Sequence, residues 1–176
     1  MTEAVNLATL GSNATPTGTL LTSSTAQATT SGTSFDFTGI PSWVQRVTVV
    51  LNAISTNGGS QIFIRIGSSV NGIETTGYLG SAVYTGPATL GATHAAGFAI
   101  SATTGAADIY VGLLTLVKVS GNTWVASSTC GSANGTLYAF IGGGNKTLAG
   151  VLDRVRITTV NGTDIFDAGS VNILWE

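Results

Sequence analysis

The sequence GTSFDFTGIPSWVQRVTVVLNAISTNGGS, residues 32–60, decides the fold, because it contains a strand end, a corner, a long apolar strand and a turn. Pro41 lies at the corner, where its fixed φ and missing amide hydrogen break any strand ladder. Trp43 follows at once, and we expect its large ring to be buried at this corner. The stretch therefore predicts two strands that meet at a tight bend.

The long strand after the corner, residues 44–54, is rich in Val, Leu and Ile, which favours burial of at least one of its faces. Thr56-Asn57-Gly58-Gly59 comes next, and Asn and Gly tolerate the positive φ of tight turns. We expect residues 61–66 to return from this turn as the hairpin partner of the long strand.

The rest of the chain repeats this pattern of short apolar strands and polar turns. Further strands are expected at residues 26–37, 94–100, 109–119, 123–130, 136–141, 152–160 and 171–175. Ser120-Gly121-Asn122 predicts a hairpin, and the three glycines at 142–144 predict the end of a strand. Residues 67–92 are expected to form a long Gly-rich loop with room for a short strand at 77–84, and such loops often carry function or interfaces.

The pattern as a whole predicts an all-β protein. No window shows helical periodicity with the residues that favour helices. Strands of this length, separated by Gly, Asn and Ser turns, favour an antiparallel two-sheet sandwich of jelly-roll type. We expect residues 26–176 to form this single sandwich domain.

The N-terminal residues 1–25 have a different composition, rich in Ala, Thr, Ser and Gly with few large aliphatic residues. Such a segment cannot bury enough apolar surface to fold alone. We therefore expect an arm that packs on a neighbouring subunit or a larger particle. The alternative is an arm that lies along its own domain.

The composition predicts a protein that works inside an assembly. Charged residues make up 8% of the chain, against about 25% in ordinary soluble domains, and the mean hydropathy is +0.39. A surface with so few charges is covered by Thr, Ser, Asn and Gly, or by other subunits. We therefore expect an oligomer.

The charge pattern, the length of the apolar runs and the cysteine count exclude several classes of protein. The net charge is −2 and there is no Lys/Arg cluster, so the sequence predicts no nucleic-acid binding. No apolar run reaches 18 residues, and the N-terminus lacks the features of a secretory signal, so neither membrane insertion nor export is expected. Cys130 is the single cysteine, which excludes an intramolecular disulfide and favours synthesis in the cytoplasm.

Residue types that can perform catalysis occur singly and far apart along the chain. His94 is the single histidine, and we interpret it as a structural or interface residue, with a Cys–His nucleophile pair with Cys130 as the alternative. A glycosidase needs two carboxylates across the sugar, and no pair is indicated here. The isolated acidic residues are Asp36, Glu74, Asp108 and Asp153. We expect no enzyme activity and no cofactor.

Metal binding is likewise not expected. Asp164 and Asp167 in NGTDIFDAGS have the chemistry to share a calcium ion, but their spacing does not match an EF-hand loop. We interpret them as turn-capping residues that pair with Arg154 or Arg156. The GGGNK sequence at 142–146 lacks the spacing and the helix of a phosphate loop, and it predicts a turn.

Aromatic residues are the remaining candidates for ligand contact. Tyr78, Tyr84 and Trp124 are predicted to offer ring faces to a ligand such as a sugar, and Tyr138 is a further aromatic of the same kind. Tyr78 and Tyr84 fit this role better because they lie in the predicted long loop. The alternative for each ring is packing in the core.

Four stretches of the sequence are distinctive: GTSFDFTGIPSWVQRVTVVLNAISTNG, GIETTGYLGS, NTWVASS and KTLAGVLDRVRITTVNGTDIFDAGSVNILWE. They resemble the C-terminal domain of tail-fibre and related virion proteins of tailed bacteriophages. They occur in the same order over residues 32–176. The closing stretch and the FTGIPSWV corner are the specific parts of the resemblance.

The resemblance implies a β-rich, trimeric virion module that faces outward and contacts the host surface. We expect a tail-fibre or tail component, made in the host cytoplasm, that adheres to a host glycan or pilus by multivalent, non-catalytic binding. Its other partners are copies of itself and, through residues 1–25, other virion proteins. Such domains often end long fibre chains, whereas here the domain is nearly the whole sequence. A capsid decoration protein or head fibre that stabilises the shell is therefore the alternative.

Overall fold

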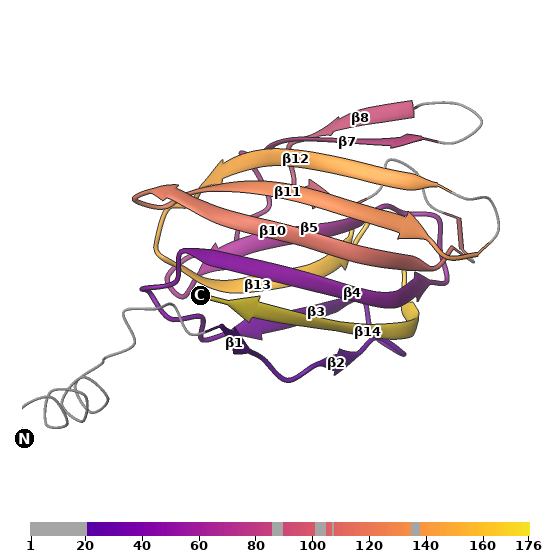
Figure 1. Cartoon of the computed structure of the whole chain (residues 1–176), viewed down its shortest axis with the longest axis horizontal. Helices are drawn as coiled ribbons and strands as arrows, with labels where there is room; N and C mark the ends of the chain where they lie inside the picture. Colours follow the sequence, from indigo (N-terminus) through magenta and orange to yellow (C-terminus); the bar gives the residue numbers. More distant parts are fainter. Residues whose placement is uncertain (1–20, 86–89, 101–104, 107, 135–137) are drawn as a thin grey trace, which may run out of the picture.

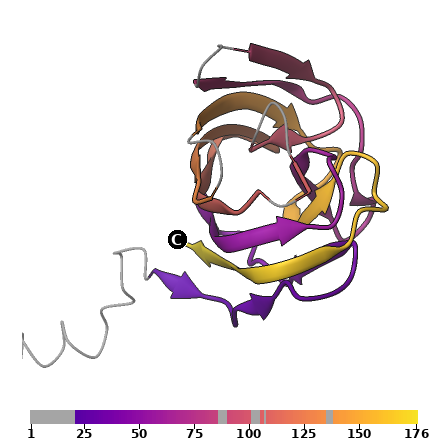
Figure 2. The ribbon, with the colours of Figure 1, turned by 90° about the vertical axis from the view of Figure 1, so that its right-hand side faces the viewer.

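The computed structural model describes residues 21–85, 90–100, 105, 106, 108–134 and 138–176, and these residues contain strands and no helix (Figure 1). The strands form two antiparallel sheets that face each other as layers (Figure 2). The predicted all-β, two-sheet sandwich is therefore confirmed.

The larger sheet has nine strands in the described part of the chain. They are β1 (Thr22–Ser23), β2 (Gln27–Ala28), β4 (Arg46–Thr56), β7 (Leu79–Thr85), β8 (Leu90–His94), β10 (Tyr110–Ser120), β11 (Thr123–Ser132), β12 (Ala139–Thr147) and β14 (Phe166–Trp175). Their order is β1-β14-β4-β10-β11-β12-β7-β8, and β2 also pairs with β14. The centre of this sheet is the run of long strands from β4 to β12.

The smaller sheet has five strands within the same described ranges. They are β3 (Ser34–Thr38), β5 (Ile62–Ser68), β6 (Gly72–Ile73), β9 (Phe98–Ala99) and β13 (Leu152–Thr159). Their order is β3-β13-β5-β6, and β9 also pairs with β5. The inward rows of the two sheets form the main core, for example Val47 and Leu51 of β4 facing the layer of Ile64, Val155 and Ile157.

The predicted corner at Pro41 is confirmed, because β3 and β4 lie in different sheets on either side of it. The predicted burial of Trp43 is wrong, since this residue is 52% exposed. The turn is closed by the Val44 amide, which donates to the Pro41 carbonyl (3.1 Å). Ile40 and Val44 point inward from its two ends and are buried, and they take the place in the core that Trp43 was expected to fill.

The predicted hairpin at residues 56–59 is wrong in its partner, although the turn itself is present. Thr56 Oγ1 donates to the Gly58 carbonyl (3.1 Å), but the chain then crosses to the other sheet. β4 pairs with β10 and β14, so both of its edges are already occupied. β5 therefore pairs with β13 instead and buries Ile62, Ile64 and Ile66 against the opposite layer.

The three glycines at 142–144 do not end a strand or form a turn, because β12 runs through all of them to Thr147. A Cβ at Gly144 would lie 2.3 Å from the Leu79 carbonyl oxygen, and one at Gly142 would lie 2.6 Å from Ser128 Oγ. Glycine is thus required for the close approach of neighbouring segments and not for chain reversal.

The loop predicted at 67–92 contains more structure than expected. The strand expected at 77–84 is present as β7, and β8 follows it as an antiparallel neighbour. Residues 94–100 form only the short β9, while His94 closes β8. Short Gly- and Ala-rich strands such as β8 carry too weak an alternation to be predicted.

The first and the last strands of the described chain, β1 and β14, pair with each other. Thr22 and Ser23 pair with Trp175 and Leu174, so this part of the predicted arm lies along its own domain. Residues 1–20, the remainder of the predicted arm, lie outside the described residues. β14 itself begins five residues before the predicted strand, because bulges around Gly169 interrupt its alternation.

Candidate interaction surface

The outer face of the larger sheet carries most of the exposed large aliphatic side chains of the described chain. We call the outward residues of β4, β10, β11, β12 and β7 the apolar face. Its large exposed members are Leu79, Val111, Leu113, Val117, Val119, Val125 and Ile141. Single exposed aliphatic residues are ordinary, whereas a contiguous set on one face indicates an interaction site.

Strand register makes these residues neighbours. Val117 lies opposite Val125, and Leu113 lies opposite the half-buried Val50 on its other side. Ile141 lies opposite Val83 of β7. Directly opposed side chains on one face of a sheet are in contact range, so each of these pairs is in contact range, and Thr129 lies between Leu113 and Ile141 in the same row.

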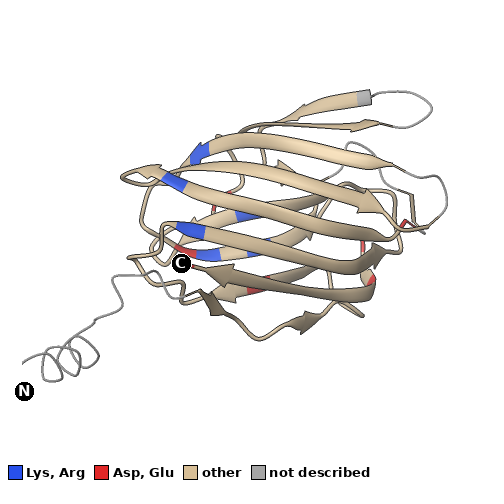
Figure 3. Cartoon of the chain, in the orientation of Figure 1, with Lys and Arg blue, Asp and Glu red and all other residues tan. Residues whose placement is uncertain are grey.

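Apart from Arg46, the remaining positions of the apolar face are uncharged and mostly small. They include Thr48, Ser81, Thr115, Ser127, Thr129 and Gly143. Arg46 is the one charged residue on the outward rows of these five strands, and it forms an ion pair with Glu176 at the strand end. In Figure 3 the centre of the larger sheet is free of Lys, Arg, Asp and Glu, and the basic residues of its strands lie near the end that carries the C-terminus.

The outer face of the smaller sheet has the opposite character. Arg156 donates to both carboxylate oxygens of Asp36 (2.6 Å each), and Arg154 donates to the neighbouring Asp153 (2.8 Å). The hydrogen bonds that Arg156 donates to Asp36 raise the pKa of Arg156. Arg65 donates to the Ala96 carbonyl (2.9 Å). Charges alternate with core residues on this sheet, as expected for a face in water.

The apolar face is not flat. A shallow groove crosses it where the outward residues Thr48, Val50, Leu113 and Leu174 are lined up beside Leu21. A second hollow lies over β12, β7 and β8, at Ser81, Val83, Gly91, Ile141 and Gly143. Rows of small residues thus lie beside rows of large ones.

The three rings predicted to contact a ligand are buried. Tyr78 is 1% exposed, Tyr84 is 7% exposed and Trp124 is 2% exposed. Tyr84 packs edge-on against Tyr138 (5.0 Å between ring centroids), and the Trp124 ring lies in the main core. None of the three presents a ring face to solvent, so the prediction that they offer ring faces to a ligand is wrong and the core alternative holds.

Tyr78 is instead at the centre of a set of hydrogen-bonded and charged residues at one end of the sandwich. We call this set, which consists of Ile66, Glu74, Tyr78 and Lys146, the polar latch. The Ile66 amide donates to its hydroxyl oxygen (2.9 Å), and the hydroxyl donates to the Glu74 carbonyl (2.9 Å). Lys146 Nζ lies 5.5 Å from the ring centroid and 2.6 Å from Glu74 Oε2. Burial raises the pKa of Tyr78 to about 12, so the phenol stays protonated.

The latch was not predicted, because Lys146 is far in sequence from Glu74 and Tyr78. Lys146 belongs to the GGGNK stretch that predicted a turn, and it is 6% exposed. Burial opposes the charge on Glu74, but hydrogen bonds from Lys146 and from the Ala149 amide (2.9 Å) outweigh it and lower the pKa of Glu74. The result is a buried, paired charge that holds the segment before β7 against β12.

His94 and Cys130 lie apart. Cys130 is buried on β11, and burial raises the pKa of its thiol to about 12. His94 is on β8, packs edge-on against Phe63 (5.0 Å), and has its pKa lowered by burial. Two strands separate β11 from β8, so the structure does not bring the two together as a nucleophile pair.

The acidic turn after β13 is a capping structure. Asp164 accepts hydrogen bonds from the Ser60 amide (2.9 Å) and from Asn161 Nδ2 (2.6 Å), as predicted. The predicted pairing with Arg154 and Arg156 is wrong, because those residues pair with acidic side chains of the smaller sheet. Over the described ranges, no group of three His, Cys, Asp or Glu side chains is arranged to hold a metal ion.

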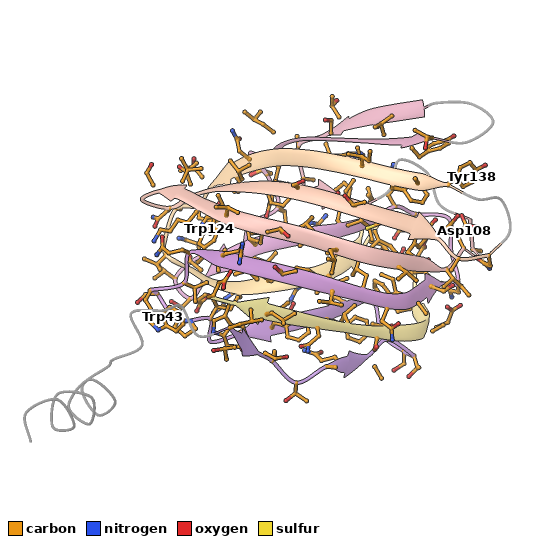
Figure 4. The ribbon with its side chains drawn as sticks, viewed as in Figure 1. Trp43, Asp108, Trp124 and Tyr138 are labelled. Carbon is orange, nitrogen blue, oxygen red and sulfur yellow. The ribbon has the colours of Figure 1, made fainter. Side chains whose placement is uncertain are left out.

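Figure 4 shows that the two ends of the sandwich differ. Trp43 lies toward the end where the chain enters, whereas Asp108 and Tyr138 lie at the far end. Asp108 accepts from the Gly105 amide (2.7 Å) and from the Tyr110 hydroxyl (3.0 Å), and Asn134 Oδ1 accepts from the Ile109 amide (2.7 Å). Among the described residues of the far end, Asp108 and Asn134 thus hold neighbouring backbone by hydrogen bonds, and we call Asp108, Asn134 and Tyr138 the rim.

Comparisons with protein-family models, curated proteins and solved structures found no match to this chain. Among the described residues, no helix is long and apolar enough to cross a membrane.

Proposed function

We propose that this chain is a structural protein of a tailed-phage virion, a tail-fibre or tail component that adheres to the host surface without catalysis. The resemblance of residues 32–176 to phage tail proteins supports this proposal. Its partners would be copies of the chain, as a trimer, and other virion proteins contacted through residues 1–25.

The observation that carries the proposal is the division of the sandwich into two unlike ends. Leu21, where the described chain begins, lines a groove with Arg46 and Glu176 at one end. Asp108 and Tyr138 lie at the opposite end of the long axis (Figure 4). A module attached by its N-terminal segment would thus present the polar, aromatic rim away from its attachment point.

The rim suits weak contact with a glycan or a pilus. Tyr138 is half-buried and supported by Tyr84 and Phe140, while Asp108 holds neighbouring backbone. A partly exposed ring beside hydrogen-bonding groups gives a modest binding site. Three such sites on one trimer, and several trimers on one particle, would turn weak contacts into strong attachment.

The test is the position of the chain on virions of the phage that encodes it. A gold-tagged antibody against the chain is expected to label tail fibres or the tail tip in electron micrographs. Label spread over the head would instead support the alternative, a capsid decoration protein or head fibre. Particles that carry no label, and whose protein digest contains no peptide of this chain, would contradict the proposal.

A further inference from the structure

We propose that the apolar face packs against another copy of this chain. The face exposes rows of large aliphatic residues, from Val111 to Val119 on β10 and across to Ile141 on β12, with Thr115 and Thr129 between them. Leaving these rows in water forgoes about 25 cal/mol for each Å² of apolar surface. A contact that covers them is therefore favourable.

The lack of charge in the interior of the apolar face limits which partners can pack against it. The interior of the face offers no charge to a basic or an acidic partner, since Arg46 at its rim is already paired with Glu176. A complementary surface must be neutral, partly apolar and of the same extent. A second copy of the same face meets all three requirements.

The relief of the face is also self-complementary. Large residues such as Leu113 and Val117 lie beside the small residues Thr115 and Ser127, and Ile141 lies beside Gly143. A two-fold contact whose axis lies midway between a row of large side chains and a row of small ones places each row against the other kind. Rows of large side chains on one copy then fit over rows of small ones on its neighbour.

The size of the face matches that of a stable interface. Five strands about 4.8 Å apart span about 24 Å, and ten residues at about 3.4 Å each span about 34 Å. The product is about 800 Å², which is the area each partner contributes to a standard protein–protein interface.

This inference goes beyond the proposed function, because a two-fold contact of the apolar face joins the copies in pairs, whereas the proposed trimer joins them through other surfaces. The first test is the mass of the purified full chain in solution, by light scattering over a micromolar concentration range. We expect an even multiple of the chain mass of 17.7 kDa. A monomer throughout the range, or a trimer without any larger species, would overturn the inference.

Paired variants then locate the contact. Val117→Lys places a charge on the apolar face, and Val151→Lys places one at a position of similar exposure (46% and 49%) outside it. We expect Val117→Lys to weaken association about tenfold or more, since a lysine would be buried without a partner. Val151→Lys should associate as the unsubstituted chain does.

Circular dichroism and thermal unfolding show whether each variant is folded. If Val117→Lys does not fold, Ile141→Lys on β12 takes its place, since Ile141 is 55% exposed. An oligomer that survives a folded apolar-face variant would overturn the inference. These measurements use the isolated chain, so their outcome is independent of where the protein lies on a virion.

Discussion

The two outer faces of the sandwich differ in how many charged side chains they carry (Figure 3). The smaller sheet covers its outer side with ion pairs, such as Asp36 with Arg156, and hydrogen-bonded Arg65. The larger sheet covers most of its outer side with Val, Leu, Ile, Thr, Ser and Gly, and its basic residues lie near one end (Figure 3). Both sheets bury apolar inner rows, so the difference between them lies in their outer faces.

The comparison shows that the low charge of the chain is not spread evenly. A face that meets water gains from charge, whereas a face that meets another protein loses by burying it. The ion pairs of the smaller sheet identify the solvent side of the sandwich. The absence of such pairs from the centre of the apolar face is therefore the feature on which the proposed contact between copies rests.

The largest expected effect separates the inner and outer rows of β12. Gly144→Ala should destabilise the fold by about 2–4 kcal/mol, because its Cβ would lie 2.3 Å from the Leu79 carbonyl oxygen. Gly143 points to the apolar face, and its Cβ would meet the Ala126 carbonyl at 3.3 Å, so Gly143→Ala should cost about 1 kcal/mol or less. Urea unfolding of both variants measures the difference, and equal losses would contradict this assignment of the rows.

The next effect concerns the charges kept at the end of the larger sheet. Glu74→Gln should cost about 2 kcal/mol near neutral pH, because it leaves the buried Lys146 ammonium without its carboxylate. The folded pKa of Glu74 is below its ordinary value of 4.5, so the folded state binds this proton less readily than the unfolded chain. The stabilisation is therefore full above pH 4.5 and is lost as the pH falls through the folded pKa.

Denaturant unfolding at a series of pH values checks this sign. The unsubstituted chain should lose stability below pH 4.5 more steeply than Glu74→Gln does. Glu74→Asp, which keeps the charge on a shorter side chain, should retain part of the dependence. Identical pH profiles for Glu74→Gln and the unsubstituted chain would show that the latch carries no net stabilisation.

A smaller effect is expected on the charged face. The side chains of Arg156 and Asp36 are 35% and 40% exposed, so solvent screens their attraction. A double-mutant cycle with Arg156→Ala and Asp36→Ala should give a coupling energy below about 1 kcal/mol, and it should shrink further in high salt. A coupling several times larger would mean that this face is also covered by protein.

The smallest effect on the stability of the single chain is expected for a substitution on the apolar face. Val125→Thr keeps the β-branched shape of a residue that is 42% exposed, so the unfolding free energy at high dilution should change by less than about 0.5 kcal/mol. The same substitution should make the protein more soluble at high concentration. A large loss of monomer stability would indicate that the face serves the fold and not association.

Local features of the fold were predictable from the sequence. The turn at Ser120-Gly121-Asn122 reverses the chain within a few residues, so both strands of the β10–β11 hairpin follow from neighbouring positions. Pro41 likewise acts on its own backbone, and the chain changes sheets there as predicted. What is specified by adjacent residues needs no knowledge of the rest of the molecule.

Choices between distant partners were not predictable. The sequence of β5 suits pairing with β4 as well as with β13, and the pairing depends on β10 and β14 having occupied the edges of β4. The sequence around Tyr78, Tyr84 and Trp124 fits a ring that packs in the core as well as a ring that contacts a ligand, and the structure shows all three to be buried. The strand IYVGLLTLVKV is apolar on both faces, so its sequence does not indicate which row of side chains is buried and which is exposed.

The most direct test of the central claim, that another copy covers the apolar face, is thiol labelling of Val117→Cys. Cys130 is buried and its thiol pKa is about 12, so the new thiol is the reactive one. Val151→Cys, of similar exposure, is the control. We predict that labelling of Val117→Cys slows as protein concentration rises, while labelling of Val151→Cys stays constant. Rapid labelling of Val117→Cys at every concentration, at the rate of the control, would contradict the claim.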